Sequence, residues 1–289
     1  MDLFLSQVVN GLTLGSFYAL VAVGLALIFG VARLVNFAHG EFFMVGSYLL
    51  YFAYAVWKLP YGLVVTLGVL GMALFGALFH KLIYQPVMHR AWYVQLVSTL
   101  AASFILANGA IIVFGSTQVT AATPMVSRVV SLGEVRVAEQ RLLVLAATAI
   151  AFIALHQFIE RTRQGRAMRA VAQNREAAQV LGIDIGSTTL LTFVVSGALT
   201  GLAACLVSPL YLIYPTVGSL LTLKAFAVVV IGGMGSMSGA LCAALIVGLA
   251  EAFAAGYASA EYKDALAFVL MIACLLWRPL GLRGQKVGL

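Results

Sequence analysis

The chain has 289 residues, of which 63% are hydrophobic and 9% are charged, and its formal net charge at pH 7 is +7. A soluble globular domain is usually about a quarter charged, and one soluble core could not hide this much apolar surface. The composition therefore excludes a soluble protein, and the lack of a basic patch interleaved with aromatic residues argues against nucleic acid as a partner.

Uncharged runs long enough to cross a bilayer recur along the whole chain. About 20 apolar residues span a membrane as a helix, and the even-period alternation of a membrane barrel is absent. We therefore predict an all-α polytopic membrane protein with about eight transmembrane helices in a single domain, 1–289. The expected ranges are 8–31, 37–57, 61–83, 94–114, 142–159, 187–213, 238–257 and 262–277.

The first predicted helix contains several polar residues, among them Ser16. Polar residues inside spanning helices commonly hold neighbouring helices together by hydrogen bonds. Lining a transport path is the alternative for Ser16.

Polar and ionisable residues open the second predicted helix, in the stretch NFAHGE from Asn36 to Glu41. We expect Asn36 to be the helix N-cap, a position that favours asparagine. Ionisable groups at membrane depth are costly and usually face the interior of the bundle. Two hypotheses remain. Glu41 forms an interfacial pair, for example with Arg33, or Asn36, His39 and Glu41 line the cytoplasmic gate of a transport path.

The positions of arginine and lysine predict how the chain is oriented in the membrane, because short loops rich in these residues usually stay in the cytoplasm. On this rule the loop 160–186 and the C-terminus are cytoplasmic, whereas the N-terminus lies outside. The loop 115–141 is then external, and its alternating stretch 127–137 predicts a small β-hairpin.

The loop 160–186 combines five arginines with apolar residues at steps of three and four, so we predict a short amphipathic helix near 165–182. Gly182 is well placed to end it. The apolar face consists mostly of alanines, which bury little area but allow close approach of another protein. Docking of a cytoplasmic partner is one hypothesis; topological anchoring and a helix lying on the membrane surface are the others.

The region 223–239 does not have the length of a regular spanning helix. The apolar piece 223–233 is about half a membrane long, and we predict an irregular or re-entrant segment here. Broken helices often frame substrate sites in transporters, and close packing of small residues is the alternative. The spacing of the glycines does not fit a dinucleotide-binding loop. The residues in question are Gly232, Gly233, Gly235 and Ser236.

The sequence contains no motif for binding ATP or for binding a metal ion. No lysine stands in the glycine-rich pattern of a P-loop, so we expect neither an ATP site nor any other cofactor in this chain. The three cysteines are isolated in apolar runs and the four histidines are scattered, so no metal site is predicted.

Three motifs in order resemble one family of proteins. The segment GRAMRAVAQNREAAQVLGI at 165–183 closely resembles the cytoplasmic loop of bacterial ABC importer permeases, the loop that docks into the ATPase subunit. VNFAHGEFFMVGSYL at 35–49 and VVIGGMGSMSGAL at 229–241 resemble two signatures of the permeases for branched-chain amino acids. The resemblance extends over essentially the whole chain, including RPLGLRG at the C-terminal end.

The resemblance implies a permease subunit in the bacterial inner membrane, with its N-terminus in the periplasm and its C-terminus in the cytoplasm. It implies a second, homologous permease subunit, two cytoplasmic ATPase subunits that use ATP and Mg, a periplasmic substrate-binding protein and surrounding membrane lipid. The loop 160–186 becomes a coupling loop. The residues that match its docking motif are Gly165, Arg166, Ala167, Arg169, Ala170, Asn174, Ala177, Ala178, Gly182 and Ile183.

The resemblance also implies a translocation path for a small molecule, a branched-chain or other hydrophobic amino acid. Similar permeases carry urea, short amides or aromatic acids, and these solutes remain alternatives. A transporter driven by an ion gradient would instead need ionisable groups deep in several helices. The residues predicted to line the path or gate are Ser16, Asn36, His39, Glu41, Gly232, Gly233, Gly235 and Ser236.

Overall fold

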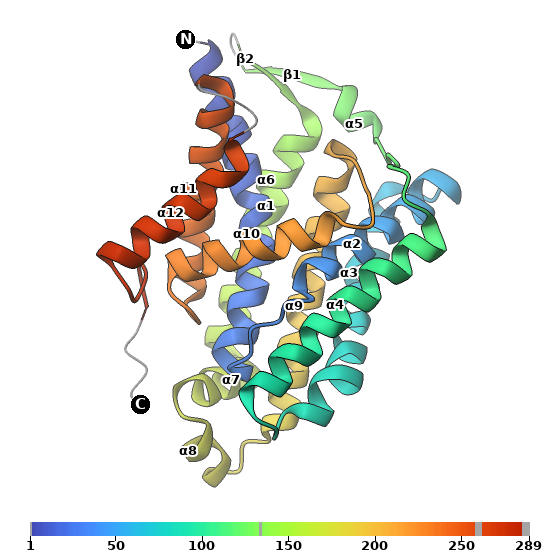
Figure 1. Cartoon of the computed structure of the whole chain (residues 1–289). Coiled ribbons are helices and arrows are strands. Elements are labelled where there is room, and N and C mark those ends of the chain that lie inside the picture. The colour runs from blue at the N-terminus through green and yellow to red at the C-terminus, as the bar shows by residue number, and fades with distance from the viewer. Residues whose placement is uncertain (1, 133–134, 258–261, 285–289) are drawn as a thin grey trace.

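The computed structural model describes residues 2–132, 135–257 and 262–284, and it is built almost entirely of helices (Figure 1), which confirms the all-α class. The strands β1 (Val129–Leu132) and β2 (Val135–Ala138) pair antiparallel and confirm the predicted hairpin. The α-helices are α1 (Asp2–Ala32), α2 (His39–Leu50), α3 (Tyr61–Phe79), α4 (Trp92–Phe114), α5 (Pro124–Ser127), α6 (Glu139–Arg161), α7 (Arg163–Gln173), α8 (Arg175–Val180), α9 (Ile185–Val207), α10 (Val217–Gly232), α11 (Met237–Tyr257) and α12 (Lys263–Trp277).

Six helical stretches of the described residues are long and apolar enough to cross a membrane. They correspond to six of the eight predicted ranges and make the chain an integral membrane protein. The predicted span 37–57 is instead the 12-residue α2 followed by a π-helical turn, and α12 in the predicted span 262–277 has 15 residues. The six stretches are Leu3–Ala32, Tyr61–Val87, Trp92–Phe114, Glu139–Arg161, Ile185–Leu210 and Met237–Tyr257.

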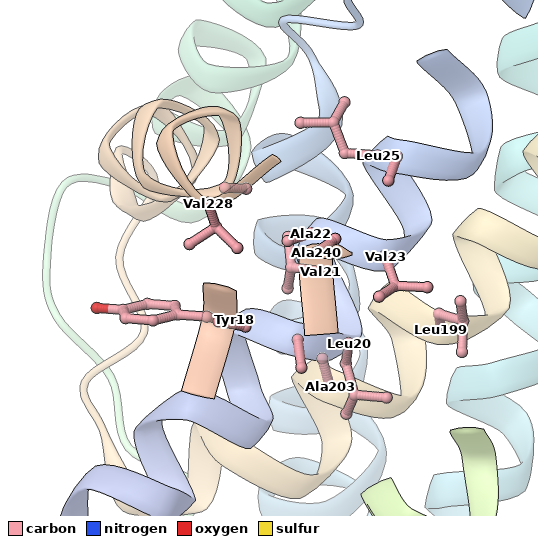
Figure 2. Close-up of a cluster of buried hydrophobic side chains, with 14 of the residues drawn as sticks. Tyr18, Leu20, Val21, Ala22, Val23, Leu25, Leu199, Ala203, Val228 and Ala240 are labelled. Carbon is pink, nitrogen blue, oxygen red and sulfur yellow. The ribbon is translucent and has the colours of Figure 1, made fainter. Parts of the chain in front are cut away.

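Helix α1 is the centre of the bundle. Its residues 20–26 are almost completely buried. Figure 2 shows them surrounded by Leu199 and Ala203 of α9, Val228 of α10 and Ala240 of α11. Glycines bring the helices close together: a Cβ on Gly248 of α11 would collide with the backbone of α1. Small residues at the contact let membrane helices approach closely, which explains how a chain rich in glycine forms a compact bundle.

Helix α2 begins inside the bundle and not at a membrane surface. Its first residue, His39, places Nε2 3.0 Å from the carbonyl oxygen of Val21. Val21 lies eleven residues before the end of α1 at Ala32, which is about 16 Å along the helix axis. The segment 33–38 therefore returns from the end of α1 to mid-bundle before α2 starts.

Helix α10 runs across the bundle, transverse to α1 (Figure 1), and with 16 residues it is about 24 Å long. It ends at Gly232, and the turn into α11 contains two glycines with positive φ, Gly233 at +101° and Gly235 at +81°. The predicted irregular segment is therefore confined to the turn after Gly232, and residues 223–232 belong to one continuous helix. The backbone N–H groups of Leu282 and Arg283 bond to the last carbonyls of α10.

The two ends of the bundle differ in character. The hairpin β1–β2 and the start of α1 lie at one end, and α7 and α8 lie at the other (Figure 1). The arginine-rich loop and the cation-free N-terminus are thus on opposite sides, as the sequence predicts.

Candidate functional site

A buried polar cluster surrounds the start of α2, where α1, α4, α9 and α10 meet. Asn36, His39 and Glu41 have no exposed surface. They therefore face the interior of the bundle, as expected for ionisable residues at membrane depth. The expected pair of Glu41 with Arg33 is not present among the ion pairs of the described residues, and Arg33 is exposed.

Asn36 is not the N-cap of α2. The helix starts at His39, and Ala38 occupies the cap position. The Asn36 side chain instead accepts a hydrogen bond of 3.1 Å from the backbone N–H of Ala38, which stabilises the tight turn before the helix. Its Nδ2 is buried and has no partner in the described part of the chain. The predicted helix start at residue 37 is therefore two residues too early.

His39 connects α2 to the two long helices behind it. Its Nε2 lies 3.0 Å from the Val21 carbonyl oxygen of α1 and 3.4 Å from Thr200 Oγ1 of α9. Gly24 leaves room for the ring, because a Cβ at that position would lie 3.3 Å from Nε2. This position gives His39 a fixed place in the packing of the cluster.

Glu41 is held by hydroxyl groups and not by a cation. Its Oε1 accepts hydrogen bonds from Ser103 Oγ at 3.2 Å and Ser219 Oγ at 3.4 Å. Its Oε2 is buried without a partner among the described residues. Glu41 belongs to the first turn of α2, and Ser219 belongs to the first turn of α10. Two helix N-termini therefore converge on one carboxylate, and their dipoles favour its charged form.

Helices α2 and α10 touch through glycine. The backbone N–H of Gly40 donates to Thr222 Oγ1 at 2.9 Å. A Cβ on Gly40 would collide with the Gly218 carbonyl oxygen and with Thr222, and a Cβ on Gly218 would collide with Glu41. Only glycine at these two positions allows the polar cluster to form.

The predicted path residues in the turn after α10 lie apart from this cluster. Ser16 is buried on α1, five residues before Val21. Gly235 packs against Gly30 near the end of α1. Ser236 Oγ accepts from the backbone N–H of Gly239 at 3.1 Å, which is a helix-capping contact at the start of α11. The structure therefore does not bring Gly232, Gly233, Gly235 and Ser236 together with Glu41.

A second set of buried charges was missed at the sequence level. Lys224 Nζ lies 2.8 Å from Tyr18 OH, 3.0 Å from the Glu251 carboxylate and 2.7 Å from Asp264 Oδ1. Neither Lys224 nor Glu251 belongs to the motifs singled out from the sequence. A lone lysine within an apolar helix was the available signal, because such a residue requires a buried partner.

An apolar cavity with a volume of about 550 Å³ lies between α2 and α4. Its lining includes Met44, Tyr48, Ile105 and Phe114, and none of its lining residues is charged. This cavity holds no charged side chain to fix the charged groups of a polar solute, so the polar cluster is the better candidate site.

The arginine-rich loop forms two helices, not the single helix predicted near 165–182. Asn174 has an extended backbone (φ −150°, ψ 108°) that separates α7 from α8. Its side chain accepts from the N–H of Ala177 and caps α8. Gly182 has φ +81°, and the N–H groups of Gly182 and Ile183 bond back into α8, so the predicted stop at Gly182 is confirmed.

Some residues of the predicted coupling loop are buried against the rest of the chain, and others are exposed. Met168, Val171 and Ala178 are buried against Val31 of α1, so much of the apolar face packs on the chain itself and is not free for a partner. Gly165 is buried, since a Cβ there would collide with the backbone of α6. Ala167, Ala170 and Ile183 are half-buried, Arg169 pairs with Glu160 at 2.7 Å, and Arg166, Asn174, Ala177 and Gly182 are exposed.

Comparison with known proteins assigns the chain to a family. A family model described as the permease component of branched-chain amino acid transport systems matches residues 7–275. The chain is 34% identical to the high-affinity branched-chain amino acid transport system permease protein BraD of Pseudomonas aeruginosa, over 98% of this chain and 96% of that protein. It is 35% identical to LivH, a permease protein with the same description in Escherichia coli, with the same coverage. It is 29% identical to the probable branched-chain amino acid transport permease LivH of Methanocaldococcus jannaschii, over 92% and 88% of the two chains. No solved structure matches.

Proposed function

The chain belongs to the family of branched-chain amino acid transport permeases, and from this premise we propose that it forms the translocation path of an ATP-driven importer for branched-chain or other hydrophobic amino acids. The family match over residues 7–275 is the observation that carries this conclusion. Urea, short amides and aromatic acids remain the alternative solutes within the same class of importer.

The path is proposed to pass the polar cluster around Glu41. This cluster is the place where α2 starts in mid-bundle and where α10 crosses, and discontinuous helices of this kind often frame substrate sites in transporters. Hydroxyl groups from α4 and α10 meet there in an otherwise apolar interior. Such a setting suits a small zwitterion with an apolar side chain.

Energy is proposed to reach the path through α7 and α8 from two partner ATPase subunits. The end of α8 exposes Val180 to 87% and Leu181 to 78%. Large aliphatic side chains exposed together outside the spanning helices are typical of an interaction surface. The capped turn at Gly182 and the packing of Met168 and Val171 on the bundle hold this surface rigid, so a push on α8 would be transmitted to α1 and α9.

The complete transporter is proposed to lie in the bacterial inner membrane with a second, similar permease subunit and a periplasmic substrate-binding protein. The arginine-rich end that carries α7 and α8 is assigned to the cytoplasm and the N-terminal end to the periplasm. ATP and Mg are expected in the partner subunits, because this chain has no P-loop.

Affinity purification of the tagged chain from its native membranes in mild detergent tests this assembly. Mass spectrometry is expected to identify P-loop ATPase chains and a second permease in stoichiometric amounts. The same purification with Leu181→Asp is the matched comparison, because that change alters only the exposed end of α8. Recovery of the chain alone, in a form that moves solute down an ion gradient, would refute the proposal.

A further inference from the structure

We propose that the Glu41 carboxylate receives the ammonium group of the amino acid in transit. This inference rests on the proposed function and deepens it, because it assigns one group of the solute to one residue of the path.

The two glutamates that are buried among the described residues differ in their partners. Glu251 is 1% exposed and has Lys224 within 3.0 Å. Glu41 has no exposed surface, and no ion pair of the described residues includes it. His39, two residues earlier, directs its ring to Val21 and Thr200. An unpaired charge in an apolar interior is costly, so the position calls for a cation that the described residues do not supply.

The surroundings of Glu41 supply hydroxyl donors and helix N-termini but no cation among the described residues. Two hydroxyl groups donate to Oε1, and the first turns of α2 and α10 point toward the carboxylate. Backbone N–H groups and helix dipoles contribute only partial positive charge. The buried Oε2 has no donor among the described residues and is the free acceptor for an ammonium group.

The site is one side-chain layer below an accessible surface. Ser219 is exposed and Ser103 is half-buried, and both hydroxyl groups bond to the carboxylate of the fully buried Glu41. These two helices lie on the same side of the molecule in Figure 1.

Apolar side chains continue from this point along α10. Leu223 and Phe226 follow Ser219 by four and seven residues, which places them on the same face of the helix. Leu223 is 46% exposed, and the ring of Phe226 stacks on Phe37 with a centroid distance of 6.5 Å. An acceptor for an ammonium group beside an aliphatic and aromatic surface matches an amino acid with an apolar side chain.

Three variants of the complete transporter in proteoliposomes test the assignment: Glu41→Gln, Glu41→Asp and the control Glu139→Gln. Glutamine keeps the shape of the side chain and its bonds to the serines but removes the charge. Glu41→Gln is expected to lower ATP-dependent leucine uptake per complex at least 30-fold. The number of complexes is measured from the amount of bound ATPase subunit. Glu41→Asp is expected to retain at least ten times more uptake than Glu41→Gln. The control residue lies at the start of α6, next to the hairpin β1–β2, and its variant is expected to stay within twofold of wild type.

The test depends on which of the two Glu41 variants supports the higher rate of leucine uptake. If Glu41 acts as a neutral hydrogen-bonding or packing residue, glutamine will support uptake at least as well as aspartate, and that order would overturn the inference. ATP hydrolysis stimulated by the loaded binding protein is expected to persist in Glu41→Gln, since docking and coupling are untouched. Failure of the wild-type complex to import any amino acid would instead refute the proposed function.

The role of the ammonium group can also be tested on the wild-type complex, by comparing the binding of two related compounds. Leucine and 4-methylpentanoate share a carbon skeleton, but the second lacks the ammonium group. In saturation-transfer NMR with the permease and ATPase subunits, 4-methylpentanoate is expected to bind at least tenfold more weakly. Equal binding of the two compounds would overturn the role of Glu41.

Discussion

Replacement of Lys224 by methionine is expected to be among the most destabilising single changes in the described bundle. Lys224 connects three helices to α10 through Tyr18, Glu251 and Asp264. Methionine fills a similar volume but leaves Glu251 buried without its cation. Loss of one partner of a buried ion pair typically costs about 3–5 kcal/mol.

The structure places the expected cost at the lower end of this range. Tyr18 OH donates to Glu251 at 2.7 Å and remains after the substitution. The Asp264 side chain is 43% exposed, so solvent compensates for its lost contact, which is worth about 1 kcal/mol or less. A loss of about 3 kcal/mol corresponds to a midpoint of thermal unfolding roughly 6–12 °C below wild type.

Thermal unfolding of the purified chain in detergent, followed by tryptophan fluorescence, measures this loss. The matched control is Lys263→Met, an exposed lysine on α12, which is expected to change the stability by less than about 0.5 kcal/mol. The double variant Lys224→Met with Glu251→Gln removes both charges and is expected to recover much of the loss. A midpoint for Lys224→Met within 2 °C of wild type would refute the reasoning, and a double variant no better than the single one would assign the effect to packing.

Three further changes test the coupling loop and the crossing of α2 with α10. Gly182→Val forces a β-branched residue to φ +81°, at a cost of about 1–2 kcal/mol or more, and is expected to reduce ATP-dependent uptake; an unchanged rate would contradict the role of the turn. Leu181→Asp is expected to lower the recovery of ATPase subunits without a change in the unfolding midpoint, and full recovery would show that α8 is not the docking surface. Gly40→Ala is expected to destabilise the chain by about 1–3 kcal/mol, because its Cβ collides with α10, whereas Gly62→Ala has open space and serves as the control. Equal midpoints for these two alanine variants would contradict the close crossing.

Features that depend on short stretches of sequence were predictable. The six long spans follow from apolar length, the β-hairpin follows from alternation, and the end of α8 follows from the requirement for glycine at positive φ. Each is decided by residues within a few positions of one another. The sequence motifs also grouped Asn36, His39 and Glu41, because these residues lie within six consecutive positions.

Features that depend on contacts between distant segments were not predictable. Lys224 and Glu251 are 27 positions apart, and nothing local indicates that α10 and α11 place them together. The start of α2 at mid-bundle depends on Val21 and Thr200 on two other helices. The break at Asn174 was hidden because the apolar period continues through it, although asparagine favours the capping position that it occupies.

The direct test of the central claim is solute uptake by proteoliposomes that contain this chain with its permease and ATPase partners. Radiolabelled leucine and the loaded binding protein are supplied outside, and ATP is enclosed or omitted. The account predicts that leucine accumulates only when ATP is enclosed and the binding protein is present. Accumulation without ATP, driven by an imposed proton or sodium gradient, would contradict it.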